Sequence, residues 1–256
     1  MDLTDRQLER YARHIVLKEV GGAGQKRLLA ARIAVVGAGG IGCPALAYLA
    51  AAGVGAVTLI DDDRVDLSNL QRQILFTETD IGAPKAKVAA ARAAALNPDC
   101  HVMPVVARLE AGNAEALLHG HELVLDGTDS FASRAAVNQA AVRLGLPLVA
   151  AAIGSFEGHV GTFAGHLADA PCWACLAGAA TDREGASCAE AGVLGALAGV
   201  LGALAALEAI RLLTGFGGET VGRLLLFDAM GFEARTVRLP KDPACPVCST
   251  AAREAA

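Results

Sequence analysis

A glycine-rich segment followed by an aspartate is the first part of the sequence that can do chemistry. Gly37, Gly39 and Gly42 form the pattern G-x-G-x-x-G, with Gly40 between them. Glycines allow a tight turn and let phosphate oxygens approach the backbone N–H groups at the start of a helix. Asp61 stands 19 residues after Gly42, where a carboxylate can accept hydrogen bonds from ribose hydroxyls. The pattern predicts a pocket for an adenine nucleotide; the alternative is a tight turn without a ligand.

The charged residues that follow indicate which reaction the pocket serves. A hydride-transfer site needs few cations, whereas a site that expels pyrophosphate must offset more negative charge. Arg72 and Lys85 can supply that charge, and Asn69 can add a neutral donor. Asp129 follows a predicted strand, at the edge of the sheet where a carboxylate can hold Mg²⁺. Singly, the two cations are typical surface charges and Asp129 is typical of a helix N-cap before Phe131; jointly, they favour ATP over NAD.

Four of the seven cysteines form two C-x-x-C pairs, Cys172 with Cys175 and Cys245 with Cys248. Four thiolates are the ligand set of a closed tetrahedral Zn²⁺ site, which has no open position and therefore a structural role. The pairs are too far apart for a local zinc ribbon, so the fold must bring them together. Disulfides, redox C-x-x-C motifs and an iron–sulfur cluster are the alternatives.

Cys188 lies in a stretch of small and polar residues that predicts a mobile loop. We expect a helix to begin near Glu190, and its N-terminus would lower the pKa of the Cys188 thiol and favour the thiolate. The alternative is an inert or accessory thiol. Cys43 and Cys100 are interpreted as small buried residues.

Apolar patterning and turn residues predict the elements that position these side chains. Short apolar runs predict strands at residues 32–36, 56–60, 101–106, 123–126, 148–151, 160–163 and 223–228. Helical spacing predicts helices at residues 4–17, with Thr4 as N-cap, and at 44–52, 84–96 and 131–144, and a long Ala/Gly/Leu helix between the last two strands. Gly21, Gly22 and Gly24 predict a loop.

Strand and helix alternate to about residue 152, which predicts an α/β fold with a Rossmann-like doubly wound sheet. We expect a single domain with a helical arm over residues 1–30, a nucleotide-binding half over 31–152 and a second half over 153–256. The second half is predicted to continue the same sheet with a mixed or antiparallel part and to carry the Cys₄ zinc site.

The overall composition is that of a compact globular protein. The chain has 256 residues, of which 54% are hydrophobic and 19% are charged, and a net charge of -5. This charge gives no reason to expect nucleic acid or an anionic membrane as a partner. The start MDLTDRQLERYARH is charged and lacks the apolar core of a signal peptide, and the apolar run at 191–207 is interpreted as a buried helix rather than a membrane span. We therefore expect a cytoplasmic protein.

Several motifs together resemble a known family. GAGGIG, LIDDDRVDLSNLQRQ, IGAPKAK and LVLDGTDS, followed by the paired C-x-x-C motifs, resemble the bacterial E1-like adenylyltransferases of the ThiF/MoeB/HesA group. The similarity runs from RYARHIVL near the start to CPVC near the end. The resemblance implies the E1-like fold and an ATP-dependent enzyme that activates the sulfur carriers of molybdopterin synthase or thiamine synthesis.

The resemblance also implies roles for individual residues. Gly40 would meet the nucleotide, Asp61 its ribose, and Asn69, Arg72 and Lys85 the phosphates. The implied nucleotide- and magnesium-binding set is Gly37, Gly39, Gly40, Gly42, Asp61, Ser68, Asn69, Arg72, Lys85, Asp129 and Ser130. Ser130 departs from the family, in which asparagine is common, but its hydroxyl can still donate a hydrogen bond.

Two further roles implied by the family concern partner proteins. Arg13 would reach into the site of a partner subunit, which makes the enzyme a homodimer. Cys188 matches a loop cysteine that links covalently to the carrier in some family members. The implied catalytic set is Arg13, Arg72, Lys85, Asp129 and Cys188.

The implied reaction is displacement at the α-phosphorus of ATP by the C-terminal glycine carboxylate of a ubiquitin-like carrier ending in Gly-Gly. The absence of a C-terminal rhodanese-like extension leads us to expect a separate sulfur donor. SNLQRQ and the long apolar helix favour the molybdopterin-synthase carrier, with the thiamine-pathway carrier as the alternative. An NAD-dependent oxidoreductase and a non-catalytic relative are the alternatives of other classes.

Overall fold

The computed structural model describes residues 2–178 and 192–249 of the chain. Within these residues, eight strands form one sheet in the order β3-β2-β1-β4-β5-β6-β7-β8. The strands are β1 (Arg32–Val36), β2 (Ala56–Ile60), β3 (His101–Val105), β4 (Leu123–Asp126), β5 (Leu148–Ile153), β6 (Glu157–Phe163), β7 (Arg223–Asp228) and β8 (Glu233–Arg238). The first five strands in this order pair in parallel, and β6, β7 and β8 continue the sheet as antiparallel strands. The predicted doubly wound sheet with an antiparallel continuation is confirmed.

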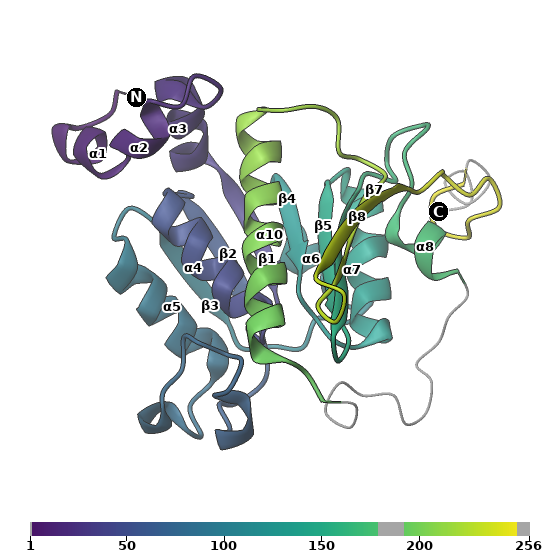
Figure 1. The fold of residues 1–256 in the computed structure, drawn as a ribbon, viewed down its shortest axis with the longest axis horizontal. Coiled ribbons are helices and arrows are strands. Elements are labelled where there is room, and N and C mark those ends of the chain that lie inside the picture. Colours follow the sequence, from purple (N-terminus) through teal and green to yellow (C-terminus); the bar gives the residue numbers. More distant parts are fainter. Residues whose placement is uncertain (1, 179–191, 250–256) are drawn as a thin grey trace.

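Helices cover both faces of the parallel part of this sheet (Figure 1). They are α1 (Asp5–Arg10), α2 (Ala12–Ile15), α3 (Gly21–Ala30), α4 (Gly42–Ala52), α5 (Lys85–Leu96), α6 (Ala114–Leu118), α7 (Phe131–Leu144), α8 (Trp173–Ala177) and α10 (Gly195–Thr214), with single 3₁₀ turns η1 (Leu67–Asn69) and η2 (Glu78–Asp80). Side chains of α4, α5 and α10 form the core on one face, and those of α6 and α7 form it on the other.

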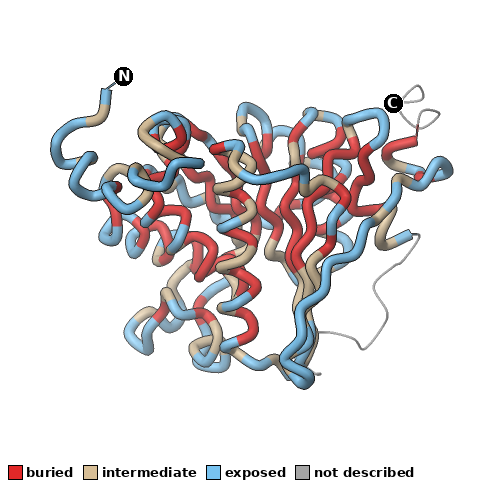
Figure 2. Tube along the Cα trace, turned by 45° about the horizontal axis from the view of Figure 1, so that its top comes forward, coloured by how far each residue is buried: buried red, intermediate tan, exposed pale blue. Residues whose placement is uncertain are grey.

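The parallel strands are apolar at nearly every position because both of their faces are buried. Ile33 and Val35 of β1 pack in the first core, and Ala34 and Val36 pack in the second. Figure 2 shows these strands as buried and the outermost strand, β8, as exposed. Because β1, β2, β4 and β5 pair in parallel, all four strands end at the same edge of the sheet.

Three sequence predictions about local structure are wrong. The N-terminal helix is interrupted at Tyr11 and forms α1 and α2, although Thr4 does cap α1 through a capping box with Gln7. The glycines at 21, 22 and 24 lie inside α3 rather than in a loop. The long helix α10 begins at Gly195, and residues 192–194 before it are not helical, so it does not begin near Glu190.

Helix α10 is, among the described residues, the one helix long and apolar enough to cross a membrane by length and composition. In this structure it packs on the sheet, and Leu197, Leu201 and Ala205 on its inner side are buried. Its last turn is held by Arg27 of α3, which donates a hydrogen bond to the carbonyl oxygen of Thr214. These contacts are typical of a helix in a protein core. Such a helix can be as long and as apolar as one that crosses a membrane.

Candidate functional site

A cavity of about 750 Å³ lies at the carboxyl ends of the parallel strands. Its walls come from the segments that follow β1, β2, β3 and β4, from the ends of β5 and β6, and from α8 and α10. In open α/β sheets this edge is where ligands bind. The cavity brings together most of the residues that the sequence singled out, including Gly37, Gly39, Gly40, Asp61, Asn69, Arg72, Lys85, Asp129 and Ser130.

The glycines of the first loop have different structural roles. Gly37 has a φ of +91°, which favours glycine. A Cβ on Gly42 would lie 1.8 Å from the carbonyl oxygen of Gly37, so only glycine lets helix α4 start this close to the strand end. A Cβ on Gly39 would have no protein atom within 4 Å among the described residues. Packing therefore requires glycine at position 42 but not at 39, where its small size leaves the backbone open to a ligand in the cavity.

Asp61 holds the glycine loop in place from the end of β2. Its two carboxylate oxygens accept the backbone N–H groups of Ala38 at 2.7 Å and of Asp63 at 2.9 Å. Burial raises the pKa of Asp61 above its ordinary value, and these two N–H donors oppose the rise. Each oxygen keeps a second lone pair, so the carboxylate can still accept hydrogen bonds from ribose hydroxyls.

Two cations flank the loop from different segments. The Arg72 side chain lies against Gly40 and donates to the carbonyl oxygen of Ser68 at 3.0 Å. Lys85 is the first residue of α5, and its side chain, 6% exposed, donates to a carboxylate oxygen of Asp63 at 2.8 Å. Both side chains line the cavity and come from different segments of the chain, so their positive charges can face a polyphosphate there.

Ser68 is the one predicted nucleotide contact on η1 that lies outside the cavity wall. Its hydroxyl and its backbone N–H both donate to Asp66, at 2.6 and 2.8 Å. Its side chain therefore stabilises the turn, and its carbonyl oxygen positions Arg72. Asn69, the next residue, lines the cavity.

The segment after β4 presents side chains to the cavity whose oxygen atoms could bind a metal ion. Ser130 is the N-cap of α7 and accepts the backbone N–H of Ser133 at 3.1 Å. The alternative reading of Asp129 as the cap is therefore wrong, and its exposed carboxylate lies on the cavity wall. Nearby, one oxygen of the buried Asp126 accepts two hydrogen bonds from Thr128, while the other has no partner among the described residues. Carboxylate and hydroxyl oxygens of this kind fit Mg²⁺.

The far end of the cavity contains residues that the sequence did not single out. Arg134 of α7, His159 of β6 and Trp173 of α8 line it. Arg134 sits inside a predicted helix and His159 just before a predicted strand, so periodicity gave them no functional signal. Only the packing of β5, β6 and α7 shows that they share a cavity.

Of the remaining two predicted catalytic residues, Arg13 does not line the cavity and Cys188 cannot be placed relative to it. Arg13 is exposed on α2, and helices α1 to α3 lie at the amino end of β1, opposite the cavity (Figure 1). Cys188 lies outside the described residues.

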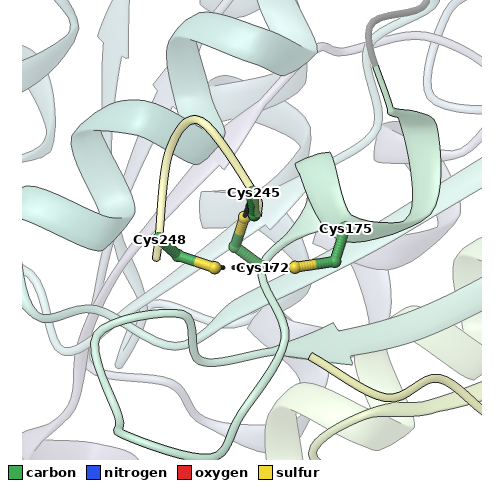
Figure 3. Close-up of side chains that lie close together, drawn as sticks. All are labelled: Cys172, Cys175, Cys245 and Cys248. Atoms are coloured by element: carbon green, nitrogen blue, oxygen red, sulfur yellow. Dashed lines mark hydrogen bonds between the residues drawn. The ribbon is translucent and has the colours of Figure 1, made fainter. Parts of the chain in front are cut away.

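The four cysteines of the C-x-x-C pairs meet at one point (Figure 3). Their sulfur atoms all lie within 4.8 Å of one another, with Cys172 and Cys245 at 3.7 Å and Cys175 and Cys248 at 3.5 Å. A tetrahedral ion with Zn–S bonds of about 2.3 Å places its sulfurs about 3.8 Å apart, so the cluster fits zinc. None of the four is in a disulfide.

Groups around the cluster support the same interpretation. The side-chain amide of Asn138 donates to the sulfur of Cys172 at 3.5 Å, and the backbone N–H of Asp242 donates to that of Cys175 at 3.5 Å. Such donors orient and stabilise thiolate ligands. The cluster ties the C-terminal segment to α8, next to the far end of the cavity.

The whole chain is similar to proteins of known activity. The model of the ThiF family matches residues 11–247. The chain is 46% identical over 253 residues to the sulfur carrier protein adenylyltransferase of Thermus thermophilus, covering 97% of this chain and 93% of that protein. It is 45% identical over 249 residues to the SAMP-activating enzyme E1 of Haloferax volcanii, covering 97% and 91%. The molybdopterin-synthase adenylyltransferase of Escherichia coli is 40% identical over 247 residues, covering 96% and 98%.

Solved structures show the same fold. A crystal structure of E. coli MccB with MccA-N7isoASN superposes with a TM-score of 0.82 at 21% identity, covering 94% of this chain and 75% of that one. This similarity supports the fold alone.

Proposed function

This chain belongs to the ThiF family and is an enzyme of the nucleotidyltransferase class, and from that premise we propose that it uses ATP to adenylate the C-terminal glycine carboxylate of a ubiquitin-like sulfur carrier. The observation that carries the proposal is the single cavity that joins an open glycine backbone, two cations from different segments and an exposed aspartate. A hydride-transfer site does not need this charge arrangement.

Binding of ATP in the proposed site uses the carboxyl edge of β1 and β2. Asp61 accepts hydrogen bonds from the ribose, and Gly39 lets the phosphates approach the start of α4, where unpaired backbone N–H groups and the helix dipole favour negative charge. Arg72 and Lys85 neutralise the phosphates. Mg²⁺, held by Asp129 with help from Ser130, would supply further positive charge to the leaving pyrophosphate.

The acceptor carboxylate displaces pyrophosphate from the α-phosphorus of the bound ATP. One carboxylate oxygen forms the new bond to phosphorus, the bond to the bridging oxygen breaks, and an acyl-adenylate and pyrophosphate result. No general base is needed, because a carboxylate is ionised at neutral pH. The protein therefore acts by positioning the two substrates and by stabilising charge with Arg72 and Lys85.

The partner protein needs a docking surface beside the cavity. Phe156 and the β7–β8 turn, with Met230 and Phe232, lie at the same edge of the sheet as the cavity, and the backbone N–H of Ala229 donates to the carbonyl oxygen of Phe156 at 2.8 Å. Phe156, Met230 and Phe232 are 49%, 76% and 86% exposed. Exposed apolar side chains of this kind are typical of protein contacts, and we propose that the carrier docks here.

Arg13 leads us to propose a homodimer. Because α2 lies at the opposite end of the sheet from the cavity of its own chain, Arg13 can act only in the cavity of a second subunit. Arg13→Ala and Asp129→Ala homodimers should both be inactive. Mixing them should restore up to about a quarter of wild-type activity, because half of the dimers are then mixed and each has one intact site. No recovery in confirmed mixed dimers would exclude an action of Arg13 across the interface.

The identity of the carrier is the finer part of the proposal. We propose the small subunit of molybdopterin synthase, with the thiamine-pathway carrier as the alternative and sulfur supplied by a separate donor. The test is ATP–pyrophosphate exchange with each purified carrier, alongside NAD binding as the comparison. Exchange with one Gly-Gly-ending carrier and no NAD binding is expected. A covalent role for Cys188 stays a prediction, which unchanged sulfur transfer in Cys188→Ser would exclude.

A further inference from the structure

Part of the cavity wall is formed by residues that the proposed ATP site does not use. This part, the distal pocket, is formed by the ends of β5 and β6, the first turn of α7 and helix α8. Its lining residues are Phe131, Ser133, Arg134, Ala152, Ile153, His159, Trp173, Leu176 and Ala177. Most of these are apolar, and Arg134 is the one permanent cation among them.

Arg134 is 7% exposed, and only part of its guanidinium is used by the protein. Its Nη2 donates to the carbonyl oxygen of Ala151 at 2.9 Å and to that of Thr128. Its Nη1 is buried and has no hydrogen-bond partner within residues 2–178 and 192–249, and no carboxylate of these residues forms an ion pair with it. A buried guanidinium without a counter-ion is costly, so a donor left over in a cavity wall indicates an anionic ligand.

The two carbonyl contacts also fix where that donor lies. Thr128 directly precedes Asp129, and Ala151 lies near the end of β5, so the guanidinium sits between the proposed magnesium residue and the distal pocket. Arg134 lines the same cavity as Arg72 and Lys85, so an acceptor group bound by Arg134 would share that cavity with the phosphates of the proposed ATP site.

His159 adds no positive charge to the distal pocket at neutral pH, so Arg134 carries the charge there. The side chain is half-buried, and burial, together with the positive charge of Arg134, lowers the pKa of His159 to about 4. The imidazole is therefore neutral at pH 7 and forms, with Trp173 and Ile153, an uncharged wall. An extended peptide end with small residues and one terminal negative charge matches this pocket.

We propose that Arg134 binds the terminal carboxylate of the carrier through Nη1 and holds it against the α-phosphate. The inference rests on the proposed function, because it assigns a residue to the second substrate of that reaction. Arg134 is thus a substrate-binding residue for the carrier rather than for ATP.

The test compares a carrier that ends in a carboxylate with the same carrier ending in a carboxamide. Both are titrated onto the full-length enzyme in the presence of α,β-methylene-ATP, which cannot be cleaved between the α- and β-phosphorus. Wild type should prefer the carboxylate by about 10- to 100-fold, as for a hydrogen bond to a charged group. Arg134→Gln should lose most of this preference and bind the nucleotide as wild type does. Arg143→Gln, an exposed arginine of the same helix paired with Glu115, is the control and should keep the preference.

Each outcome decides one of the two claims. Absence of pyrophosphate exchange by wild type with every Gly-Gly carrier refutes the proposed function. Normal exchange by wild type with an unchanged carboxylate preference in Arg134→Gln refutes only the role of Arg134, as does a variant that loses affinity for the nucleotide instead. If Arg134→Gln does not fold, Arg134→Lys replaces it, because a single ammonium nitrogen lacks the planar fork of donors by which the guanidinium reaches the two carbonyls and the substrate from separate nitrogens. A Lys variant that keeps the full preference would overturn the proposal.

Discussion

Two glycines of the same loop should respond in opposite ways to the addition of one methyl group. Gly42→Ala places a Cβ 1.8 Å from the carbonyl oxygen and 2.9 Å from the carbonyl carbon of Gly37, and both atoms are backbone. The strand end and helix α4 must then move apart by more than 1 Å, since ordinary contacts of this kind begin at about 3.4 Å. We expect this variant to lose about 3 kcal/mol of stability, which lowers Tm by about 6–12 °C.

Gly39→Ala should leave the fold intact and weaken the binding of the ligand. Its Cβ meets no described protein atom within 4 Å, and Gly39 is not in the positive-φ region that favours glycine. The stability should stay the same or rise by about 0.4–1 kcal/mol, because alanine restricts the unfolded chain. The methyl group points into the space assigned to phosphate, so the loss of a charge-assisted hydrogen bond, about 1.5–3 kcal/mol, should weaken ATP binding by about 10- to 150-fold.

Thermal unfolding and isothermal titration with Mg·ATP measure the two effects on the same samples. We expect Gly42→Ala to be destabilised and Gly39→Ala to be stable but to bind ATP weakly. A stable Gly39→Ala protein with wild-type affinity would show that the phosphates do not lie against this loop. A Gly39→Ala protein as unstable as Gly42→Ala would show that the loop is packed differently.

Three further predictions concern other parts of the chain. Lys85→Met should raise the barrier to pyrophosphate exchange by about 2–4 kcal/mol, whereas Lys87→Met, exposed on the same helix, should leave the exchange rate unchanged. Cys175→Ser should lose bound zinc and unfold at lower temperature, while Cys100→Ala should keep one zinc by elemental analysis. Burial raises the pKa of Tyr11 from 10.0 to about 12, so its contribution to stability is complete below pH 10 and is lost as the pH rises to 12. Denaturant titrations of Tyr11→Phe should therefore show a smaller loss of stability than wild type over this interval.

Four strands could be predicted from the sequence to the residue, whereas β3, β5 and β6 overlap their predicted ranges but end or begin elsewhere. β1, β2, β4 and β7 match the predicted bounds because each is a continuous apolar run. β8 was missed because EARTVR has charges throughout and is exposed at every position, so no apolar alternation marks it. Only pairing with β7 makes it a strand.

The glycines of α3 show how tertiary packing overrides propensity. Three glycines within four residues predict a loop, yet Gly24 lies against Val20 and Thr214, where a Cβ would be 3.0 Å from the Val20 side chain. The Val20 side chain is the tight neighbour, and Thr214 of α10 would be at an ordinary 3.6 Å, so this packing favours a small residue there. Helix propensity describes an isolated segment and contains no information about such a neighbour.

The residues of the candidate site also divide into those that the sequence could predict and those that it could not. The glycine loop, Arg72, Lys85 and Asp129 could be found because they stand in a motif or follow strands that end at one edge. Arg134 and His159 could not be found in this way. The unpaired donor of Arg134 and the burial of His159 result from the packing of β5, β6 and α7. Such features arise only when the elements have packed.

The most direct test of the account is carrier-dependent exchange of labelled pyrophosphate into ATP, measured for wild type and for Asp129→Ala. We predict exchange by wild type only when a carrier with an unmodified Gly-Gly carboxyl end is present, and a loss of at least about 100-fold in the variant. Exchange by Asp129→Ala at the wild-type rate, with its fold intact, would contradict the proposal that this cavity transfers AMP with a metal bound at Asp129.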